Sequence, residues 1–191
     1  MAYQTYITEA LVCGSDNRNT SDRNFLLFTR EGGMVWANAR SVRLERSKQR
    51  YGLQPCSYVR MSLVSGKAGW HIAGVEPLQN MYYLAEGRQA RALVRNTIQL
   101  LRRVLQGEVP YQAVFDDVIT TLQKCNEYDR DTLETVLSFR ILNSLGYVSP
   151  RDEQLSVLSS THAFSDIESI TEKEIALYKE MIEESLHASQ L

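Results

Sequence analysis

Residues 28–55 read FTREGGMVWANARSVRLERSKQRYGLQP, in which a short strand pattern at 33–39 runs directly into a cluster of cations. Between Arg40 and Arg50 the only acid is Glu45. Each lysine or arginine that neutralises a phosphate releases a condensed counterion, so a cluster of this kind at the rim of a small β-domain is typical of a polyanion-binding surface. An ordinary solvated loop is the alternative. The residues predicted to contact a nucleic-acid strand are Arg40, Arg43, Arg46, Lys48, Arg50 and Tyr51.

The strand pattern belongs to a series of five. Apolar and polar residues alternate, with turn residues between the runs, at 6–13, 24–29, 34–42, 56–64 and 70–75. Gly32-Gly33 predicts a tight turn between the second and third strands, because glycine accepts a positive φ. Five short strands predict a small closed β-barrel, which pattern alone assigns neither to the OB-fold nor to an SH3-like barrel.

Aromatic side chains on and beside these strands are candidates for stacking on unpaired bases. The alternative for each one is ordinary packing in the core or at the rim. Tyr51 is the strongest candidate because it lies inside the basic run. The candidates are Trp36, Tyr51, Tyr58 and Trp70.

After Pro77 the hydrophobic period changes from two residues to 3.6, which predicts helices at 88–105, 111–124, 131–145 and 171–187, with a short one at 152–158. Gly146 predicts the end of the third long helix, and Thr171 with Glu174 predicts a capping box at the start of the last. The chain is therefore expected to be α+β, with a barrel domain at 1–79 and a helical domain at 80–191.

The first long helix carries arginines at spacings of three, four and seven residues, on the side opposite its leucines. This arginine stripe is predicted to bind either a DNA backbone or an acidic peptide, and a solvated helix face is the alternative. Its members are Arg88, Arg91, Arg95 and Arg102.

Several segments resemble the RecO family of bacterial recombination mediators. In that family a strand ending FT…G leads into AKGAR, a basic loop and LQPF, and residues 28–33, 39–43 and 53–55 match this order without a gap. Residues 142–147, LNSLGY, resemble the family's LxxLGY helix end. Ser41 stands where the family has Gly, and Cys56 where it has Phe.

The resemblance implies an OB-fold barrel that binds single- and double-stranded DNA, anneals complementary strands and helps to load a recombinase. It also implies two partners, a RecR-type protein and the acidic C-terminal tail of single-strand-binding protein, the latter docking on the helical domain. Many relatives carry a four-cysteine zinc module after the LGY helix. Residues 148–152 contain no cysteine, so no zinc site is expected.

Residues 1–103 carry a net charge of +8 and residues 104–191 one of −10, which predicts different partners for the two halves. No nucleophile, metal cluster or phosphate loop has the required spacing, so we expect no enzyme and no cofactor. Three widely spaced cysteines and the absence of a long apolar run predict a cytoplasmic protein, and the resemblance to RecO implies that it is nucleoid-associated. Two alternative functions remain open, an interaction adaptor whose acidic helices recruit a basic partner and a general RNA-binding module.

Overall fold

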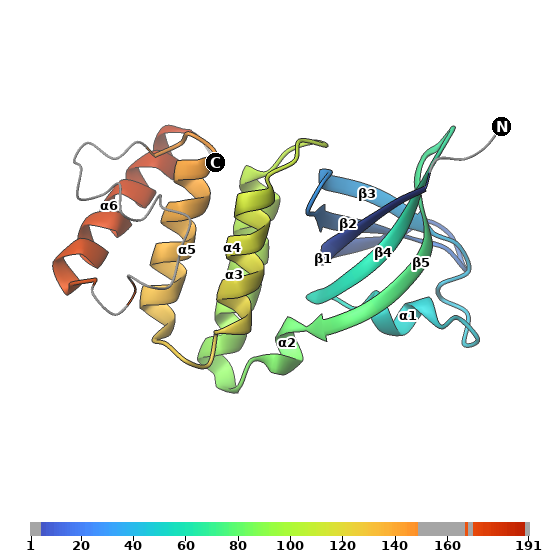
Figure 1. Cartoon of the computed structure of the whole chain (residues 1–191), viewed down its shortest axis with the longest axis horizontal. Coiled ribbons are helices and arrows are strands. Elements are labelled where there is room, and N and C mark those ends of the chain that lie inside the picture. Colours follow the sequence, from blue (N-terminus) through green and yellow to red (C-terminus); the bar gives the residue numbers. More distant parts are fainter. Residues whose placement is uncertain (1–4, 149–166, 168–169, 190–191) are drawn as a thin grey trace. The chain divides into compact units, whose positions relative to one another are not determined.

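The computed structural model describes residues 5–148, 167 and 170–189. The chain divides into two compact units, which we call the barrel unit and the helical unit (Figure 1). The barrel unit comprises Met1–Leu84 and Leu105–Phe115, and the helical unit comprises Ala85–Val104 and Asp116–Leu191. The expected domain boundary at residue 79 stays a prediction.

Five strands form a closed barrel in the order β1-β2-β3-β5-β4. They are β1 (Thr5–Asn17), β2 (Arg23–Thr29), β3 (Gly33–Ala39), β4 (Ser57–Gly66) and β5 (Gly69–Asn80), accompanied by the short helices α1 (Gln49–Gly52) and α2 (Met81–Leu84). All neighbours are antiparallel except β3 and β5. This closed ring followed by helices confirms the α+β fold class and is consistent with the OB-fold.

The interior of the barrel is apolar and draws on every strand, because alternate residues of a strand point to opposite faces. Phe25, Leu27 and Met61 are among its largest buried side chains. The outer face of β2 is covered as well, since Phe28 makes an edge contact of 5.3 Å between ring centroids with Phe115. Residues 105–115 therefore complete the barrel unit.

The predicted turn at Gly32-Gly33 is confirmed, and Gly33 has φ 69°. Backbone approaches it closely, because a Cβ at this position would lie 2.1 Å from the carbonyl oxygen of Val109. The next amide, that of Met34, donates to the carbonyl of Gly107 at 3.1 Å. Gly33 thus serves both the turn and the seating of residues 105–115.

Three strand ends differ from the prediction by three residues or more. β1 continues to Asn17 instead of stopping at 13, with an irregularity in its pairing between Val12 and Gly14. β3 stops at Ala39 instead of residue 42, because Ser41 takes φ 53°, a left-handed conformation that a strand does not continue through. β5 continues past Pro77 to Asn80 instead of stopping at 75. Its partner over that stretch is β4, while β3 pairs with it only at Trp70 and His71, so Pro77 lies where one side of β5 is an edge.

The helical unit contains α3 (Gly87–Val104), most of α4 (Gln112–Gln123), α5 (Arg130–Ser144) and α6 (Glu172–Ala188). The capping box of Thr171 and Glu174 is confirmed. Gly146 has φ 78°, and Tyr147 donates its amide to the carbonyl of Leu142 at 2.9 Å, as in a Schellman C-cap. The short helix expected at 152–158 lies outside the described residues.

Candidate nucleic-acid interface

The predicted cations lie on the segment that leaves β3 and returns through α1 to β4; we call residues 40–51 the basic loop. All five of its cationic residues are exposed. Two apolar side chains, Val42 within the segment and Leu53 just after it, are each 3% exposed and belong to the barrel core. These anchors fix the segment to the barrel and leave its charged side chains in solvent.

A second loop, between β1 and β2, holds the start of the basic loop in place. The amide of Ser41 donates to the Asp22 carboxylate at 2.7 Å, and the Arg43 guanidinium donates to the Asn19 carbonyl at 2.8 Å. The Arg43 amide also donates to the carbonyl of Ser21 at 3.1 Å. The left-handed turn at Ser41 is therefore stabilised by its neighbours, in the position where the resembling family has Gly.

Asp22 is the acid at this junction, and its pKa lies below the ordinary carboxyl value. The main cause is the hydrogen bond from the Ser41 amide, followed by the Asn19 side chain, with a smaller contribution from the positive charge of Arg40. At neutral pH the turn is thus held by a carboxylate.

At the far end of the loop, the Arg50 guanidinium lies 5.0 Å from the centroid of the Tyr51 ring and donates to its hydroxyl at 3.3 Å. Tyr51 is 63% exposed. An exposed ring under a guanidinium offers a flat surface and a positive charge together, which suits base stacking beside a phosphate. The exposure expected for Tyr51 is confirmed, while its contact with DNA stays a prediction.

The other aromatic candidates divide by exposure. Trp36, on β3, is 47% exposed. Tyr58 donates its hydroxyl to Glu9 at 2.5 Å and packs near Phe115. Trp70 donates its indole N–H to Glu108 at 3.0 Å and meets Tyr6 edge-on. Tyr58 and Trp70 therefore contribute to packing within the barrel unit. Trp36, like Tyr51, is exposed and can stack on a base.

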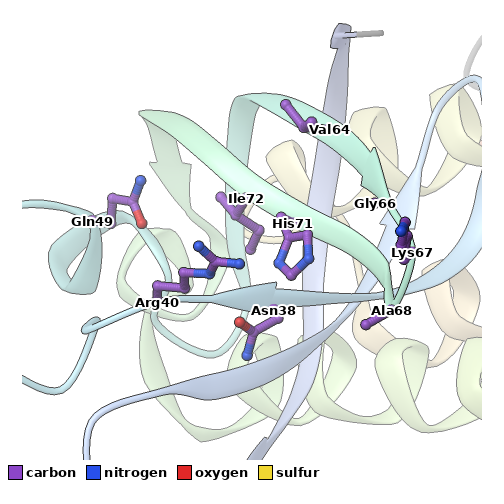
Figure 2. Close-up of a pocket in the computed structure, with 9 residues that line it drawn as sticks. All are labelled: Asn38, Arg40, Gln49, Val64, Gly66, Lys67, Ala68, His71 and Ile72. Carbon is purple, nitrogen blue, oxygen red and sulfur yellow. The ribbon is translucent and has the colours of Figure 1, made fainter. Parts of the chain in front are cut away.

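A hollow of about 640 Å³ opens next to the basic loop; we call it the β3–β5 hollow (Figure 2). Its polar lining comes from β3, the basic loop with α1, the turn between β4 and β5, and β5 itself, and its remaining residues are Val64, Gly66, Ala68 and Ile72. The polar residues are Asn38, Arg40, Gln49, Lys67 and His71. Of the predicted site residues, the hollow contains only Arg40.

Sequence reasoning missed the polar residues of the hollow other than Arg40. Asn38 and His71 face each other across the parallel β3–β5 pairing, which links residues more than thirty positions apart. Gln49 is positioned by its amide, which donates to the carbonyl of Ala73 at 3.2 Å. No local sequence pattern predicts a pairing between residues so far apart. Lys67, in the Gly66-Lys67 turn, could be recognised as a cation from the sequence.

The arginine stripe lies on α3 of the helical unit as predicted, with all four of its arginines exposed. Arg91 donates to the carbonyl of Ala85 at 3.2 Å, which ties it to the start of the helix. Val94 and Ile98 are buried, so they do not offer an apolar border for a bound peptide. Arg103, which the sequence interpretation left out, is also exposed.

No group of three or more metal-ligating side chains occurs in the described part of the chain. Burial raises the pKa of the thiols of Cys56 and Cys125, and among the described residues neither these two cysteines nor Cys13 forms a disulfide bond. Among the described helices, none has the length and apolar character that crossing a bilayer requires.

Comparison with known proteins identifies the barrel. Residues 1–81 match the family model described as Recombination protein O N terminal. Proteins named DNA repair protein RecO are similar over a longer stretch. The one from Desulfitobacterium hafniense (strain DSM 10664 / DCB-2) is 28% identical over 142 residues, covering 74% of this chain and 52% of the relative.

Two further relatives of that name agree. The protein from Symbiobacterium thermophilum is 28% identical over 144 residues, covering 74% of this chain and 57% of the relative. That from Dehalococcoides mccartyi (strain ATCC BAA-2266 / KCTC 15142 / 195) is 24% identical over 163 residues, covering 83% of this chain and 64% of the relative. The matched stretch thus spans little more than half the length of these relatives. The resemblance to RecO is confirmed: the chain is similar to RecO proteins over about three quarters of its length, and its first 81 residues match the N-terminal domain of that family.

Proposed function

We propose that this chain is a DNA-binding mediator of recombinational repair whose barrel unit holds DNA on the basic loop. The observation that carries the proposal is a loop of five exposed cations, anchored in the barrel core by Val42 and Leu53, on a RecO N-terminal domain. Such a surface neutralises phosphates, and exposed aromatic rings beside it can stack on unpaired bases.

Annealing is the proposed activity, and it requires no covalent chemistry. A cationic surface that neutralises two backbones lowers their mutual repulsion, and base pairing supplies the driving force. The protein is accordingly proposed to act without catalysis and without a cofactor. Its proposed role in the cell is to help load a recombinase onto DNA coated by single-strand-binding protein, together with a RecR-type partner.

The acidic tail of single-strand-binding protein is the second proposed ligand, and the arginine stripe is its proposed site. A stripe of guanidinium groups suits carboxylates because each can form paired hydrogen bonds with them. Because Val94 and Ile98 are buried, the proposed site on α3 recognises the tail by its charge and not by apolar contacts.

The deciding experiment measures binding of a labelled single strand, a duplex and an RNA strand of equal length, followed by annealing of complementary strands with and without single-strand-binding protein. We expect salt-dependent binding of both DNA forms and faster annealing in each case. A suitable control is Arg60→Ala, because this barrel cation is already paired with Glu9 and Glu76. Absence of DNA binding, or a clear preference for RNA, would contradict the proposal.

A further inference from the structure

The β3–β5 hollow contains a buried polar atom with no partner. The Nδ1 atom of His71 is enclosed and forms no hydrogen bond within the described part of the chain. A buried imidazole nitrogen in that state costs free energy, which a group entering the hollow would recover by bonding to it.

His71 is held in this position by its surroundings. Its backbone lies in β5, paired with both Val64 of β4 and Asn38 of β3. Its ring packs over Gly66, where an added Cβ would lie 3.0 Å from Cδ2 and 3.1 Å from Nε2. The absence of a side chain at Gly66 therefore leaves room for the imidazole beside it.

The charges around the hollow are of one sign. Arg40 and Lys67 both line it, no carboxylate does, and neither cation has an ion pair with any residue that the structure describes. Figure 2 shows the Arg40 guanidinium directed toward His71 and Lys67 on the opposite side, in the β4–β5 turn. An anionic oxygen between Arg40 and His71 would accept from the guanidinium and from an Nδ1–H.

The rest of the lining favours a nucleotide over a bare anion. Val64, which is half-buried, provides apolar surface beside His71, and Gln49 provides the carbonyl oxygen of its amide. The volume of about 640 Å³ lies within the range of roughly 300–1,000 Å³ usual for small-molecule sites. Phosphate, apolar ring and polar base edge thus each have a complementary group.

We infer that the β3–β5 hollow binds one nucleotide of an unpaired DNA strand, with its phosphate between Arg40 and His71 and its base against Val64. This inference rests on the proposed DNA-binding function and adds a distinct site to it. Arg40 belongs to both the basic loop and the hollow, so a strand on the loop can continue into the hollow. A duplex cannot, because its bases are stacked and paired inside the helix.

The first test compares single-strand and duplex affinity for Lys67→Ala and His71→Leu, with Lys48→Ala as the matched control. Lys48 is an exposed cation of the basic loop that does not line the hollow. Each hollow variant should lose roughly tenfold in single-strand affinity, as expected for a hydrogen bond to a charged group, and little in duplex affinity. Lys48→Ala should weaken both forms alike.

Asn in place of His71 is the rescue variant, since its amide nitrogen can take the place of Nδ1. His71→Asn should bind the single strand close to wild type, whereas His71→Leu should not. Thermal melts identify any variant that fails to fold, and Lys67→Ala changes only an exposed turn. Equal losses for single strand and duplex in Lys67→Ala would overturn the inference.

The second test needs no oligonucleotide. NMR of the imidazole signals during titration with thymidine 5′-monophosphate, thymidine or inorganic phosphate should show a saturable shift of His71 with the nucleotide, a weaker one with phosphate and none at exposed His187. If the protein binds DNA but the His71 signal does not change, the nucleotide site in the hollow is refuted and the proposed DNA-binding function is not. Failure of the wild type to bind any DNA would refute the proposed function and this inference with it.

Discussion

The cations of the basic loop contact no acid within the described residues, whereas three cations of the helical unit are each paired with a carboxylate. Arg140 bonds to Asp117, Arg130 to Glu134 and Lys179 to Asp131. A cation paired with a carboxylate has its charge compensated within the fold, while one without an ion pair is left to water or to an external anion. Within the helical unit, Arg88, Arg95 and Arg102 of the arginine stripe have no ion pair with a described residue in the structure and resemble the basic loop in this respect.

The comparison is sharpest at the pair of Arg140 and Asp117, whose side chains are only 8% and 15% exposed and whose Nε and Oδ2 atoms lie 2.8 Å apart. Asp117→Ala leaves a buried guanidinium without its carboxylate and should lower the free energy of unfolding by about 3–5 kcal/mol. Urea unfolding measures this. Glu76→Ala, which removes an exposed partner of Arg60, should cost no more than about 1 kcal/mol. A loss below about 1 kcal/mol for Asp117→Ala would show that the pair is not structural.

Substitutions in the basic loop should have the opposite effect: a large decrease in DNA affinity and a small change in the free energy of unfolding. Changing Arg40, Arg43 and Arg46 together to Ala should reduce the slope of log K against log salt by roughly 2–3 units, one counterion for each lost phosphate contact. Binding titrations at several salt concentrations measure the slope. Arg60→Ala should leave it unchanged. If the folded triple variant keeps the wild-type slope, the loop is not the phosphate site.

Substitutions in the arginine stripe test whether exposed cations of the helical unit also bind a ligand. Arg95→Glu should weaken binding of an acidic peptide tail by about tenfold, because it replaces attraction by repulsion, and should leave annealing of bare strands intact. Arg103→Glu makes the same charge change beside the stripe and serves as control. Fluorescence anisotropy with a labelled tail peptide gives the affinity. Loss of annealing with tail binding preserved would assign the stripe to DNA.

The left-handed turn at Ser41 gives a smaller effect, confined to stability. Ser41→Gly removes the steric cost of φ 53° but adds freedom to the unfolded chain, so the net gain should be no more than about 1 kcal/mol. Thermal unfolding measures it, and DNA affinity should not change. A clear destabilisation would mean that the serine side chain holds the turn.

The smallest effect concerns pH. Because the pKa of Asp22 is lower in the folded protein, its stabilising contribution is present above the ordinary carboxyl pKa and is lost as pH falls through the folded value. Asp22→Asn keeps an acceptor for the Ser41 amide but removes the charge. The stability difference between wild type and Asp22→Asn should therefore shrink below about pH 4 in denaturant titrations. A difference that does not change with pH would exclude the charge as the cause.

The sequence by itself determined the elements that depend on neighbouring residues. Strand alternation, the glycine turn at Gly33, the C-cap at Gly146 and the capping box at Thr171 involve contacts over a few positions, so their signals are local. The exposure of the loop cations was predictable for the same reason. With Glu45 as the only acid among five cations, these charged side chains stay in solvent unless the fold brings further acids close to them.

Only the tertiary structure decided which segments distant in sequence come into contact. The parallel pairing of β3 with β5, the clamp of Asn19 and Asp22 on the basic loop, and the burial of Val94 and Ile98 all depend on segments distant in sequence. The β3–β5 hollow arises in the same way, since Arg40 and His71 lie on strands and loops that only barrel closure brings together. Side-chain periodicity specifies which face of a strand is apolar, but closure of the sheet specifies which polar groups share a site.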